Sequence, residues 1–435
     1  MSHSGTPGAA RAHLLRLFET AVAAAHPRSC LPPHLPAPPA QGRLVILAAG
    51  KAAGAMAEAA EHHYLDRLGW PTHRLAGIAV TRHGYGRPTR VLPVVEAGHP
   101  LPDQAGLAAA ETTLALADAA GANDLVLVLV SGGASANWIA PAPGLSLAEK
   151  QAVTRALLAC GATISEINTV RKHLSRIKGG RLALRAHPAR LVTLAISDVP
   201  GDDPAVIGSG PTVPDPSTLA DARAIIARYR LELPGSVERI LGDSASETPK
   251  PGNPVFADAE FRIVARPRDA FRAVEAELAG SADAPMFLGD RIEGEAREVA
   301  ARHAELALEL QREGRSAVIL SGGELTVTLR GKGRGGPNQE YALALAIAIA
   351  GASGIAALAA DTDGTDGGAG AAQDPAGAFI DPTTLARARD IGLDPALFLA
   401  DNDATGFFTR VGDLLVTGPT CTNVNDFRAI LVDRR

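Results

Sequence analysis

The sequence is poor in residues that several functional classes need. It has three cysteines in 435 residues, Cys30, Cys160 and Cys421, too few and too scattered for a disulfide framework or a zinc site. Aromatic residues make up only 4% of the chain, so stacking platforms for single-stranded nucleic acid are not expected. No apolar run reaches the roughly 20 residues that span a membrane, and Arg16 and Glu19 interrupt the one N-terminal segment with signal-peptide character. We therefore expect a cytoplasmic protein without a nucleic-acid or membrane partner.

Two common sequence signatures are also missing, and a third is out of place. The chain has no G-x-x-x-x-G-K-[ST] phosphate loop and no G-x-S-x-G nucleophile elbow. One G-x-G-x-x-G match occurs, at 331–336, but it follows a polar strand and not the buried strand that precedes a dinucleotide fingerprint. The formal net charge of -5 argues against the basic patch of a nucleic-acid-binding protein.

What the chain does contain is a regular alternation of apolar strands and helical segments, which predicts an α/β fold. An amphipathic helix is expected over 8–25 and a proline-rich loop over 27–39. A polar, proline-containing stretch near 240–255 suggests a boundary between two α/β domains, 1–245 and 246–435. The expected strands are 43–49, 77–81, 124–130, 190–196, 261–265, 284–289, 316–323, 325–331 and 354–360.

Small residues and one lysine follow several of these strands. Gly50 and Lys51 stand between the first strand and a helix, where a lysine opposes the helix dipole unless an anion binds there. Two Ser-Gly-Gly motifs, Ser131-Gly132-Gly133 and Ser321-Gly322-Gly323, follow buried strands and would expose backbone N–H groups to a ligand. A tight strand-to-helix connection explains either motif equally well, but their recurrence in the two halves favours a binding role. Glu324 directly follows the second motif.

A strongly basic segment covers 167–183 and includes Arg171 and Lys172. A solvated helix face is the usual explanation for such a charge run. Because the chain as a whole is acidic, we favour a site for a carboxylate or a polyanion, with Arg171 or Lys172 as the binding residue.

Two acidic, glycine-rich loops follow buried strands. The first contains Asp198 within SDVPGDD, and the second, DTDGTDGG, contains Asp361, Asp363 and Asp366. Carboxylates at strand ends suit a magnesium nucleotide site or a base that accepts a hydroxyl proton. We expect Asp198, Asp361 and Asp363 to be candidate Mg²⁺ ligands, and Asp198 or Asp361 to be the base.

The segment GKGRGGPNQE, residues 331–340, leads from glycines into a helix that opens at Pro337 and Asn338. A mobile loop that carries Arg334 to a helix N-terminus suits stabilisation of a transferring phosphoryl group. A flexible surface hairpin is the alternative. Asn338 is a further candidate binding residue.

Together these motifs resemble the class II glycerate kinase family, also called the MOFRL family. The resemblance is carried in order by GKAAGAM, SGGASANW, INTVRKHLSRIKGGRLA, SDVPGDDPAVIGSGPTVPD, SGGELTVTLRGKGRGGPNQE, DTDGTDGGAGA and GPTCTNVNDF. It covers about residues 10 to 428. It implies two Rossmann-like α/β domains, a glycerate kinase N-terminal domain followed by a MOFRL domain, with an active-site cleft between them. Cys421 stands where the family pattern leads us to expect glycine.

The resemblance implies ATP-dependent phosphorylation of D-glycerate with Mg²⁺, most often to 2-phosphoglycerate. Lys51 and Arg334 match positions held to be functional in the family, and we expect both to neutralise the transferring phosphoryl group. The expected partners are the nucleotide and D-glycerate, and a homodimer is one assembly that we leave open. An NAD(P)H-dependent hydroxypyruvate reductase is the alternative, since that label has also been used in the family, and a non-catalytic phosphosugar-binding regulator is a more distant one.

Overall fold

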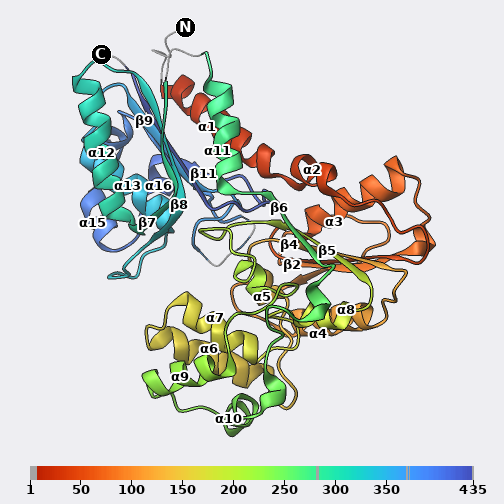
Figure 1. Cartoon of the computed structure of the whole chain (residues 1–435). Coiled ribbons are helices and arrows are strands. Elements are labelled where there is room, and N and C mark those ends of the chain that lie inside the picture. Colours follow the sequence, from red (N-terminus) through yellow and green to blue (C-terminus); the bar gives the residue numbers. More distant parts are fainter. Residues whose placement is uncertain (1–6, 281–283, 369–370, 372, 434–435) are drawn as a thin grey trace. The chain divides into compact units, whose positions relative to one another are not determined.

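The computed structural model describes residues 7–280, 284–368, 371 and 373–433, so residues 369–370 of the second acidic motif lie outside the described part. The chain forms two compact units (Figure 1). We call Cys30–Val264 the parallel-sheet unit, and Met1–Ser29 together with Ala265–Arg435 the mixed-sheet unit. Each is built on a six-stranded sheet with helices on its faces, which confirms the predicted α/β class.

The parallel-sheet unit has the strand order β3-β2-β1-β4-β5-β6, the order of a dinucleotide-binding Rossmann sheet. Its strands are β1 (Leu44–Ala49), β2 (Leu75–Arg82), β3 (Val94–Ala97), β4 (Leu125–Val130), β5 (Arg190–Ile196) and β6 (Glu260–Ala265). Pairing is parallel from β3 through β5. Every residue of β1 and β4 is buried, because helices cover both faces of the sheet.

Helices α4 and α8 pack on the sheet face to which Val45, Leu47 and Ala49 point, and α3 lies on the other face (Figure 1). A second, smaller core forms among α6, α7, α9 and α10. The division of the chain between Ser29 and Cys30 falls within α2 (Pro27–Cys30). The other helices of this unit are η1 (Pro32–His34), α3 (Ala53–Glu61), η2 (His62–Arg67), η3 (Thr72–Arg74), α4 (Gln104–Asp118), α5 (Ala134–Asn137), α6 (Leu147–Ala159), α7 (Ile164–His173), α8 (Arg181–Ala186), η4 (Ile207–Ser209), α9 (Leu219–Tyr229), α10 (Gly235–Gly242), η5 (Ser244–Ser246) and η6 (Pro254–Phe256).

The mixed-sheet unit has the strand order β11-β10-β9-β12-β8-β7. Its central strand β12 is antiparallel to both neighbours, β8 and β9, whereas β7 and β8 are parallel. The strands are β7 (Ala284–Glu295), β8 (Ala317–Thr326), β9 (Ile355–Asp361), β10 (Gly377–Ile380), β11 (Leu414–Leu415) and β12 (Asp426–Val432). The sequence pattern did not identify β12 as a strand.

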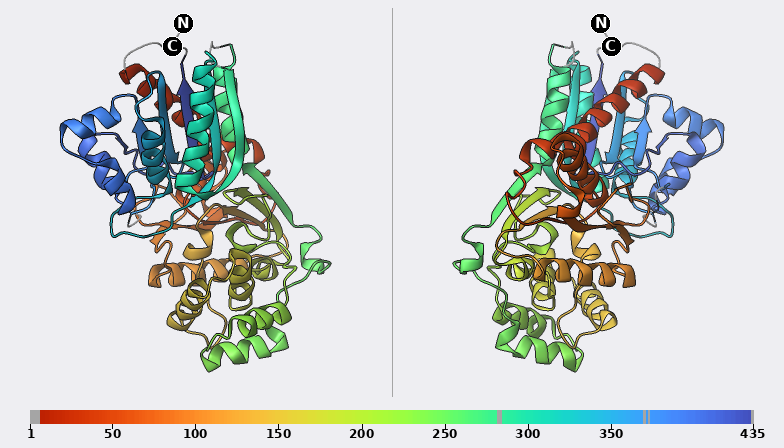
Figure 2. Two further views of the ribbon diagram at one scale, coloured as in Figure 1. Left: turned by 90° about the vertical axis from the view of Figure 1, so that its left-hand side faces the viewer. Right: turned by 90° about the vertical axis from the view of Figure 1, so that its right-hand side faces the viewer.

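Helices α1 and α11 lie together on one face of this sheet, and α12 and α13 on the other (Figures 1 and 2). The helices are α1 (Pro7–Ala25), α11 (Pro267–Leu278), α12 (Ala296–Arg312), α13 (Pro337–Ile349), α14 (Thr384–Asp390), α15 (Pro395–Ala400) and α16 (Ala404–Val411). The helix expected over 8–25 is therefore present as α1, and it packs on the C-terminal sheet.

The division of the chain differs from the one expected from sequence, 1–245 and 246–435. The polar stretch near 240–255 contains η5 and η6 and connects to β6, which is the edge strand of the parallel sheet. The compact unit consequently ends at Val264. A polar segment is a weak boundary signal because a connection within a domain is equally polar.

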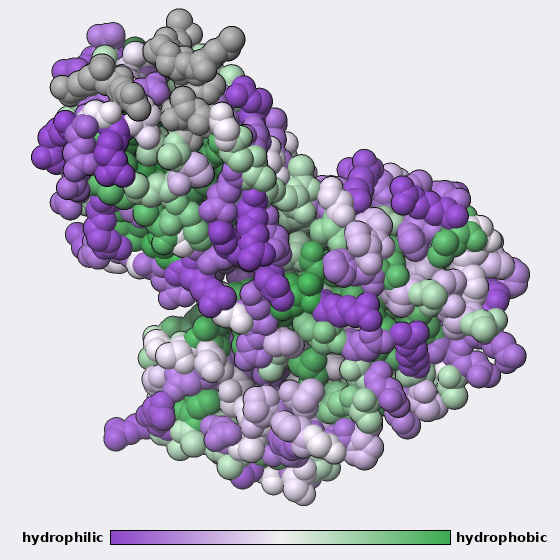
Figure 3. Space-filling model, turned by 45° about the horizontal axis from the view of Figure 1, so that its top comes forward, coloured by the Kyte–Doolittle hydropathy of each residue, from purple (hydrophilic) through white to green (hydrophobic). Residues whose placement is uncertain are grey.

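In the space-filling view, hydrophilic residues cover most of the surface of each unit, with hydrophobic residues in smaller patches (Figure 3). Within the described ranges, no helix is long and apolar enough to cross a membrane.

Candidate functional site

The carboxyl ends of β1 and β4 form the first part of the candidate site. After β1 the chain continues to β2 on one side of the sheet, and after β4 it continues to β5 on the other side. The gap between the ends of β1 and β4 is therefore the switch point at which open α/β sheets bind ligands. The backbone N of Lys51 donates to Gly132 O at 2.7 Å, and the backbone N of Ala52 donates to Ser131 Oγ at 2.9 Å. The sequence-predicted Gly50-Lys51 and Ser131-Gly132-Gly133 segments thus lie side by side.

Gly133 shows why this loop needs glycine. Its φ is +85°, and a Cβ there would lie 3.2 Å from Lys51 Cγ and 3.0 Å from the His99 ring. Lys51 precedes α3 by two residues, so its side chain belongs to the same strand ends as the loop. An anion bound at these ends would meet a lysine and a glycine turn.

The basic segment is not a solvated helix face. Lys172, His173 and Lys178 are all less than 7% exposed, and the segment is divided between two environments. Arg171 Nη2 and Lys178 Nζ donate to Ser135 O, at 3.2 and 2.7 Å respectively. These two cations therefore converge just beyond the first Ser-Gly-Gly motif.

Lys172, the alternative to Arg171, has a buried partner. Its Nζ lies 3.2 Å from Asp215 Oδ1. Burial raises the pKa of Asp215, but the charge of Lys172 contributes to lowering it, and the pKa lies below its ordinary value. The ammonium of Lys172 is thus engaged within the unit, which leaves Arg171 as the better candidate for a carboxylate ligand.

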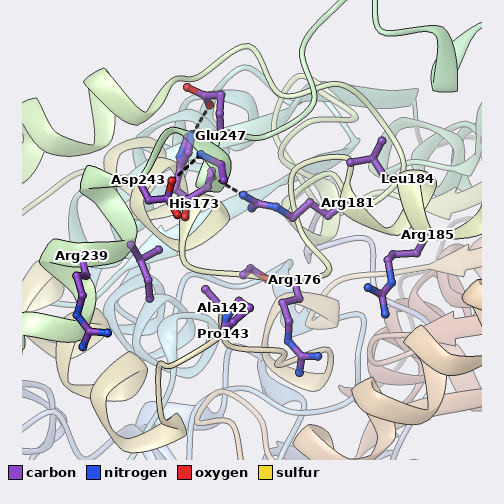
Figure 4. Close-up of a pocket in the computed structure, with 14 residues that line it drawn as sticks. Ala142, Pro143, His173, Arg176, Arg181, Leu184, Arg185, Arg239, Asp243 and Glu247 are labelled. Carbon is purple, nitrogen blue, oxygen red and sulfur yellow. Dashed lines mark hydrogen bonds and ion pairs between the residues drawn. The ribbon is translucent and has the colours of Figure 1, made fainter.

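The remaining basic residues face a cavity of about 590 Å³ on the parallel-sheet unit (Figure 4). Arg181 reaches across it to donate to Ser246 O at 2.5 Å, and His173 Nε2 lies 3.0 Å from Glu247 Oε1. Arg176 also lines this cavity but forms an ion pair with Glu111. The carboxylates Glu247 and Asp243 partly balance the arginines here.

Asp198 follows β5 after one buried serine, Ser197, and is itself half-buried. β5 is paired with β4, so Asp198 extends the row of strand ends that begins with Lys51. Its predicted role as a base or a metal ligand stays a prediction.

In the mixed-sheet unit, Asp361 ends β9 and is paired with Asp426 of β12. Asp361 Oδ1 accepts from the backbone N of Asp363 at 2.9 Å, and Asp363 Oδ1 accepts from the backbone N and hydroxyl of Thr365. Nowhere in the described residues do three or more His, Cys, Asp or Glu side chains group so as to hold a metal ion. Mg²⁺ is ordinarily held by one or two carboxylates together with substrate phosphates, and the pair at the end of β9 suits that donor set.

Asp366, by contrast, is buried and caps α13. Its carboxylate accepts from the backbone N of Asn338 at 3.0 Å and of Gln339 at 2.8 Å. Burial raises the pKa of Asp366 to about 7, the hydrogen bonds from these two N–H groups oppose the rise, and the charge of Asp426 adds to it. Asn338 Nδ2 also donates to Asp426 Oδ1 at 2.7 Å. The sequence-predicted Asn338 therefore joins two buried acids.

Arg428 balances those acids. It is 1% exposed, and its Nη1 lies 2.8 Å from Asp426 Oδ2. The same guanidinium donates to Gly322 O at 2.5 Å and to Ser321 Oγ at 3.3 Å. The second Ser-Gly-Gly motif is thus in contact with a buried ion pair.

The expectation that Ser321-Gly322-Gly323 follows its strand is wrong, because β8 continues through the motif to Thr326. The glycines serve close contacts inside the sheet: a Cβ at Gly322 would lie 2.6 Å from the Phe271 ring, and one at Gly323 would lie 2.2 Å from Ile292 O. Glu324, the next residue, is exposed.

The loop that carries Arg334 is docked along its length. Gly333 N donates to Asp401 O at 2.9 Å, and Arg334 N donates to Asp403 Oδ1 at 3.1 Å. Thr405 N in turn donates to Arg334 O at 2.9 Å. The expected glycine-rich loop therefore packs against the segment between α15 and α16, while the Arg334 side chain is exposed.

Sequence reasoning missed four of the residues that organise these strand ends. Ser135 and Ser209, whose hydroxyls are hydrogen-bonded to each other, carry no charge that would draw attention. Asp426 and Arg428 interrupt an otherwise apolar segment, DFRAILV, and charges within an apolar strand were a usable signal.

Two family models match the chain. A domain of unknown function, DUF4147, matches residues 13–242, and the MOFRL family matches residues 317–426. The two matches therefore fall in different parts of the chain and leave the segment that contains β6, α11 and α12 between them.

Full-length relatives carry two different names. A protein of Agrobacterium vitis named "Putative hydroxypyruvate reductase" is 50% identical over 97% of this chain and 94% of its own length. The D-glycerate 2-kinase of Thermotoga maritima is 38% identical over 88% of this chain and 89% of its own. The crystal structure of glycerate kinase from Thermotoga maritima is similar with a TM-score of 0.85 at 35% identity, covering 98% of this chain and 100% of that one.

Proposed function

The chain belongs to the glycerate kinase family that combines the DUF4147 and MOFRL domains, and we propose that it phosphorylates D-glycerate with ATP. The product we propose is 2-phosphoglycerate, because relatives named glycerate 2-kinase are 38% identical over about nine tenths of both chains. The observation that carries the proposal in the structure is the meeting of Lys51 with the Ser131–Gly133 loop at the β1–β4 switch point.

The chemistry of phosphoryl transfer explains these residues. The transferring group carries negative charge that positioned cations and N–H donors stabilise. In the parallel-sheet unit, Lys51 is the proposed cation and the backbone of Gly132 and Gly133 is the proposed donor surface. In the mixed-sheet unit, Arg334 is proposed as a cation for phosphoryl transfer, with its backbone held by Asp403 and Thr405.

The acceptor hydroxyl of glycerate must lose a proton as the phosphoryl group arrives. Asp198 and Asp361 both end strands and both remain proposals for the group that orients that hydroxyl or takes its proton. Asp361 with Asp363 in the mixed-sheet unit, or Asp198 in the parallel-sheet unit, would hold Mg²⁺, which when bound supplies positive charge against the nucleotide phosphates. Arg171 is proposed to bind the glycerate carboxylate.

The name of the Agrobacterium vitis relative and the Rossmann strand order favour one second candidate, an NAD(P)H-dependent hydroxypyruvate reductase. The dinucleotide fingerprint needs glycine two and five residues after the first glycine that follows β1. After Gly50 these positions are Ala52 and Ala55. The local sequence therefore favours the kinase.

One experiment separates the two functions. ADP release is measured with Mg-ATP and D-glycerate, and the product is resolved by phosphorus NMR. Glycerate-dependent ADP with a 2-phosphoglycerate resonance supports the proposal, and a 3-phosphoglycerate resonance corrects its regiochemistry. Absence of ADP together with NADPH oxidation by hydroxypyruvate in a parallel assay would establish the reductase.

A further inference from the structure

Two cations in the parallel-sheet unit converge on one serine without meeting a carboxylate. Lys178 is 1% exposed, and its Nζ donates to Ser135 O at 2.7 Å and Ser135 Oγ at 3.2 Å. Arg171 donates to Ser135 O and, at 3.5 Å, to Asn168 Oδ1. Among the described residues, neither cation has a carboxylate within ion-pair distance.

The charges that surround Lys178 are also positive. Burial lowers the pKa of Lys178 well below its ordinary value, and the charges of Arg171 and Lys150 add to this effect. Lys150 is itself buried on α6, where it donates to Leu174 O at 2.6 Å. The acid on the neighbouring loop, Asp215, is paired with Lys172. A buried cation without a counter-ion is unfavourable, so the surroundings of Lys178 disfavour its charged form.

The cluster adjoins the strand ends already described. Ser135 lies two residues after Gly133, where an added Cβ would meet Lys51 and His99. The hydroxyl of Ser209, on a different loop, is hydrogen-bonded to the Ser135 hydroxyl. Ser135 and Arg171 are only partly buried, and Lys178 lies behind them. An anion at Ser135 and Arg171 would therefore be within the influence of Lys178 without having to enter the core.

We propose that Arg171, Ser135 and Lys178 form a subsite for the carboxylate of a small hydroxy acid, and that anion binding is coupled to uptake of one proton by Lys178. The inference rests on the proposed function, because it assigns the glycerate carboxylate to this subsite. Arg171 and the Ser135 hydroxyl contact the carboxylate. Lys178 is a positioning residue, and its ammonium, formed with a proton from solvent, donates to Ser135 Oγ and supplies the compensating charge.

The test is calorimetric titration of the full chain with D-glycerate at pH 8.5 in two buffers of different ionisation enthalpy. A lysine of ordinary pKa is already protonated at this pH and takes up no proton. We expect wild-type protein to take up protons when it binds the anion, and its Kd to rise as the pH rises. Lys178→Met should abolish the uptake and raise Kd about 10- to 100-fold, as for loss of a charged hydrogen bond.

Lys150→Met is the matched control, because it removes a buried lysine that does not reach Ser135. It should retain most of the uptake and bind within a few-fold of wild type. Uptake that is absent in wild-type protein, or that the two lysine variants lose equally, would overturn the inference. The wild-type buffer and pH dependence decides this even if Lys178→Met does not fold.

The same titration with glycolate distinguishes this inference from the proposed function. Glycolate shares the 2-hydroxy carboxylate but lacks the second carbinol of glycerate. Proton-coupled binding of glycolate without binding of D-glycerate would keep the subsite and reject the kinase proposal. Binding of D-glycerate without proton uptake would reject the subsite and leave the kinase proposal standing, and binding of neither anion would reject both.

Discussion

The two Ser-Gly-Gly motifs have the same sequence but different surroundings. Ser131–Gly133 directly follows β4 and lies beside Lys51, and Arg171 and Lys178 both donate to nearby Ser135. Ser321–Gly323 lies inside β8 and contacts Arg428, whose charge is balanced by Asp426. The first motif lies near Arg171 and Lys178, which have no carboxylate partner among the described residues, whereas the second contacts an arginine that is paired with an aspartate.

This difference distinguishes surroundings that suit binding of an anionic ligand from surroundings that stabilise the fold. A buried charge that has its counter-ion within the fold contributes to folding, and breaking the pair is destabilising. Cations gathered without a counter-ion are unfavourable for folding alone, and an anionic ligand would relieve that cost. The comparison therefore predicts that substitutions near β8 act mainly on stability and that substitutions near β4 act mainly on activity.

Arg428→Met should have the largest effect, on stability. It leaves Asp426 buried without its guanidinium, and we expect a loss of about 3–5 kcal/mol in the free energy of unfolding. Urea unfolding followed by circular dichroism measures it. The double variant Asp426→Asn with Arg428→Met should recover part of the loss, and a loss below about 1 kcal/mol in the single variant would refute the structural role.

Lys51→Ala tests the opposite side of the comparison. Removing a positioned charge from phosphoryl transfer should reduce kcat about 10²- to 10³-fold. The midpoint of thermal unfolding should change little, because the hydrogen bond from Lys51 N to Gly132 O comes from the backbone and is retained in the variant. Turnover by the glycerate-dependent ADP assay and thermal unfolding are measured on the same preparation. A variant with near-wild-type turnover would remove Lys51 from the proposed mechanism.

Arg334→Ala should likewise reduce kcat by about 10²-fold or more. Lys332→Ala is its matched control, since both residues are exposed and both donate a backbone N–H to an aspartate of the docking segment, at 3.0 Å for Lys332 and 3.1 Å for Arg334. Equal losses in the two variants would indicate a general charge effect of the loop.

His303, which is buried near Arg428, should make the stability of the protein depend on pH. Burial lowers its pKa from 6.5 to about 4, and the charge of Arg428 adds to this. Because the folded pKa lies below the unfolded one, the unfolded chain binds the proton first, so stability is lost as pH falls from about 6.5 to about 4. The loss amounts to about 3 kcal/mol. His303→Gln should flatten this part of the urea-unfolding profile, and an unchanged profile would contradict the assignment.

The fold class and the β1–β4 end followed from the sequence because buried parallel strands and the turns after them have local signals. Gly50, Lys51 and the first Ser-Gly-Gly motif were recognisable in this way. The continuation of β8 through the second motif was not recognisable from the sequence, because whether that strand ends or continues depends on its neighbour β12 and on Phe271. The pairing of Lys172 with Asp215, 43 residues away, is likewise a tertiary property.

The smallest predicted effects compare the two motifs directly. Gly322→Ala would place a Cβ 2.6 Å from the Phe271 ring. Such overpacking should cost about 1–3 kcal/mol of stability and should leave KM for glycerate unchanged.

Gly133→Ala would place its Cβ within 3.2 Å of two side chains only, Lys51 and His99. The new alanine must, however, adopt a φ of +85°, which costs about 1–2 kcal/mol of stability. Because the new methyl group displaces Lys51, kcat should fall several-fold more in Gly133→Ala than in Gly322→Ala. Steady-state kinetics and urea unfolding of both variants measure the two effects. If both glycines affected stability and neither affected turnover, the two motifs would share a structural role, and the distinction drawn from their surrounding charges would not hold.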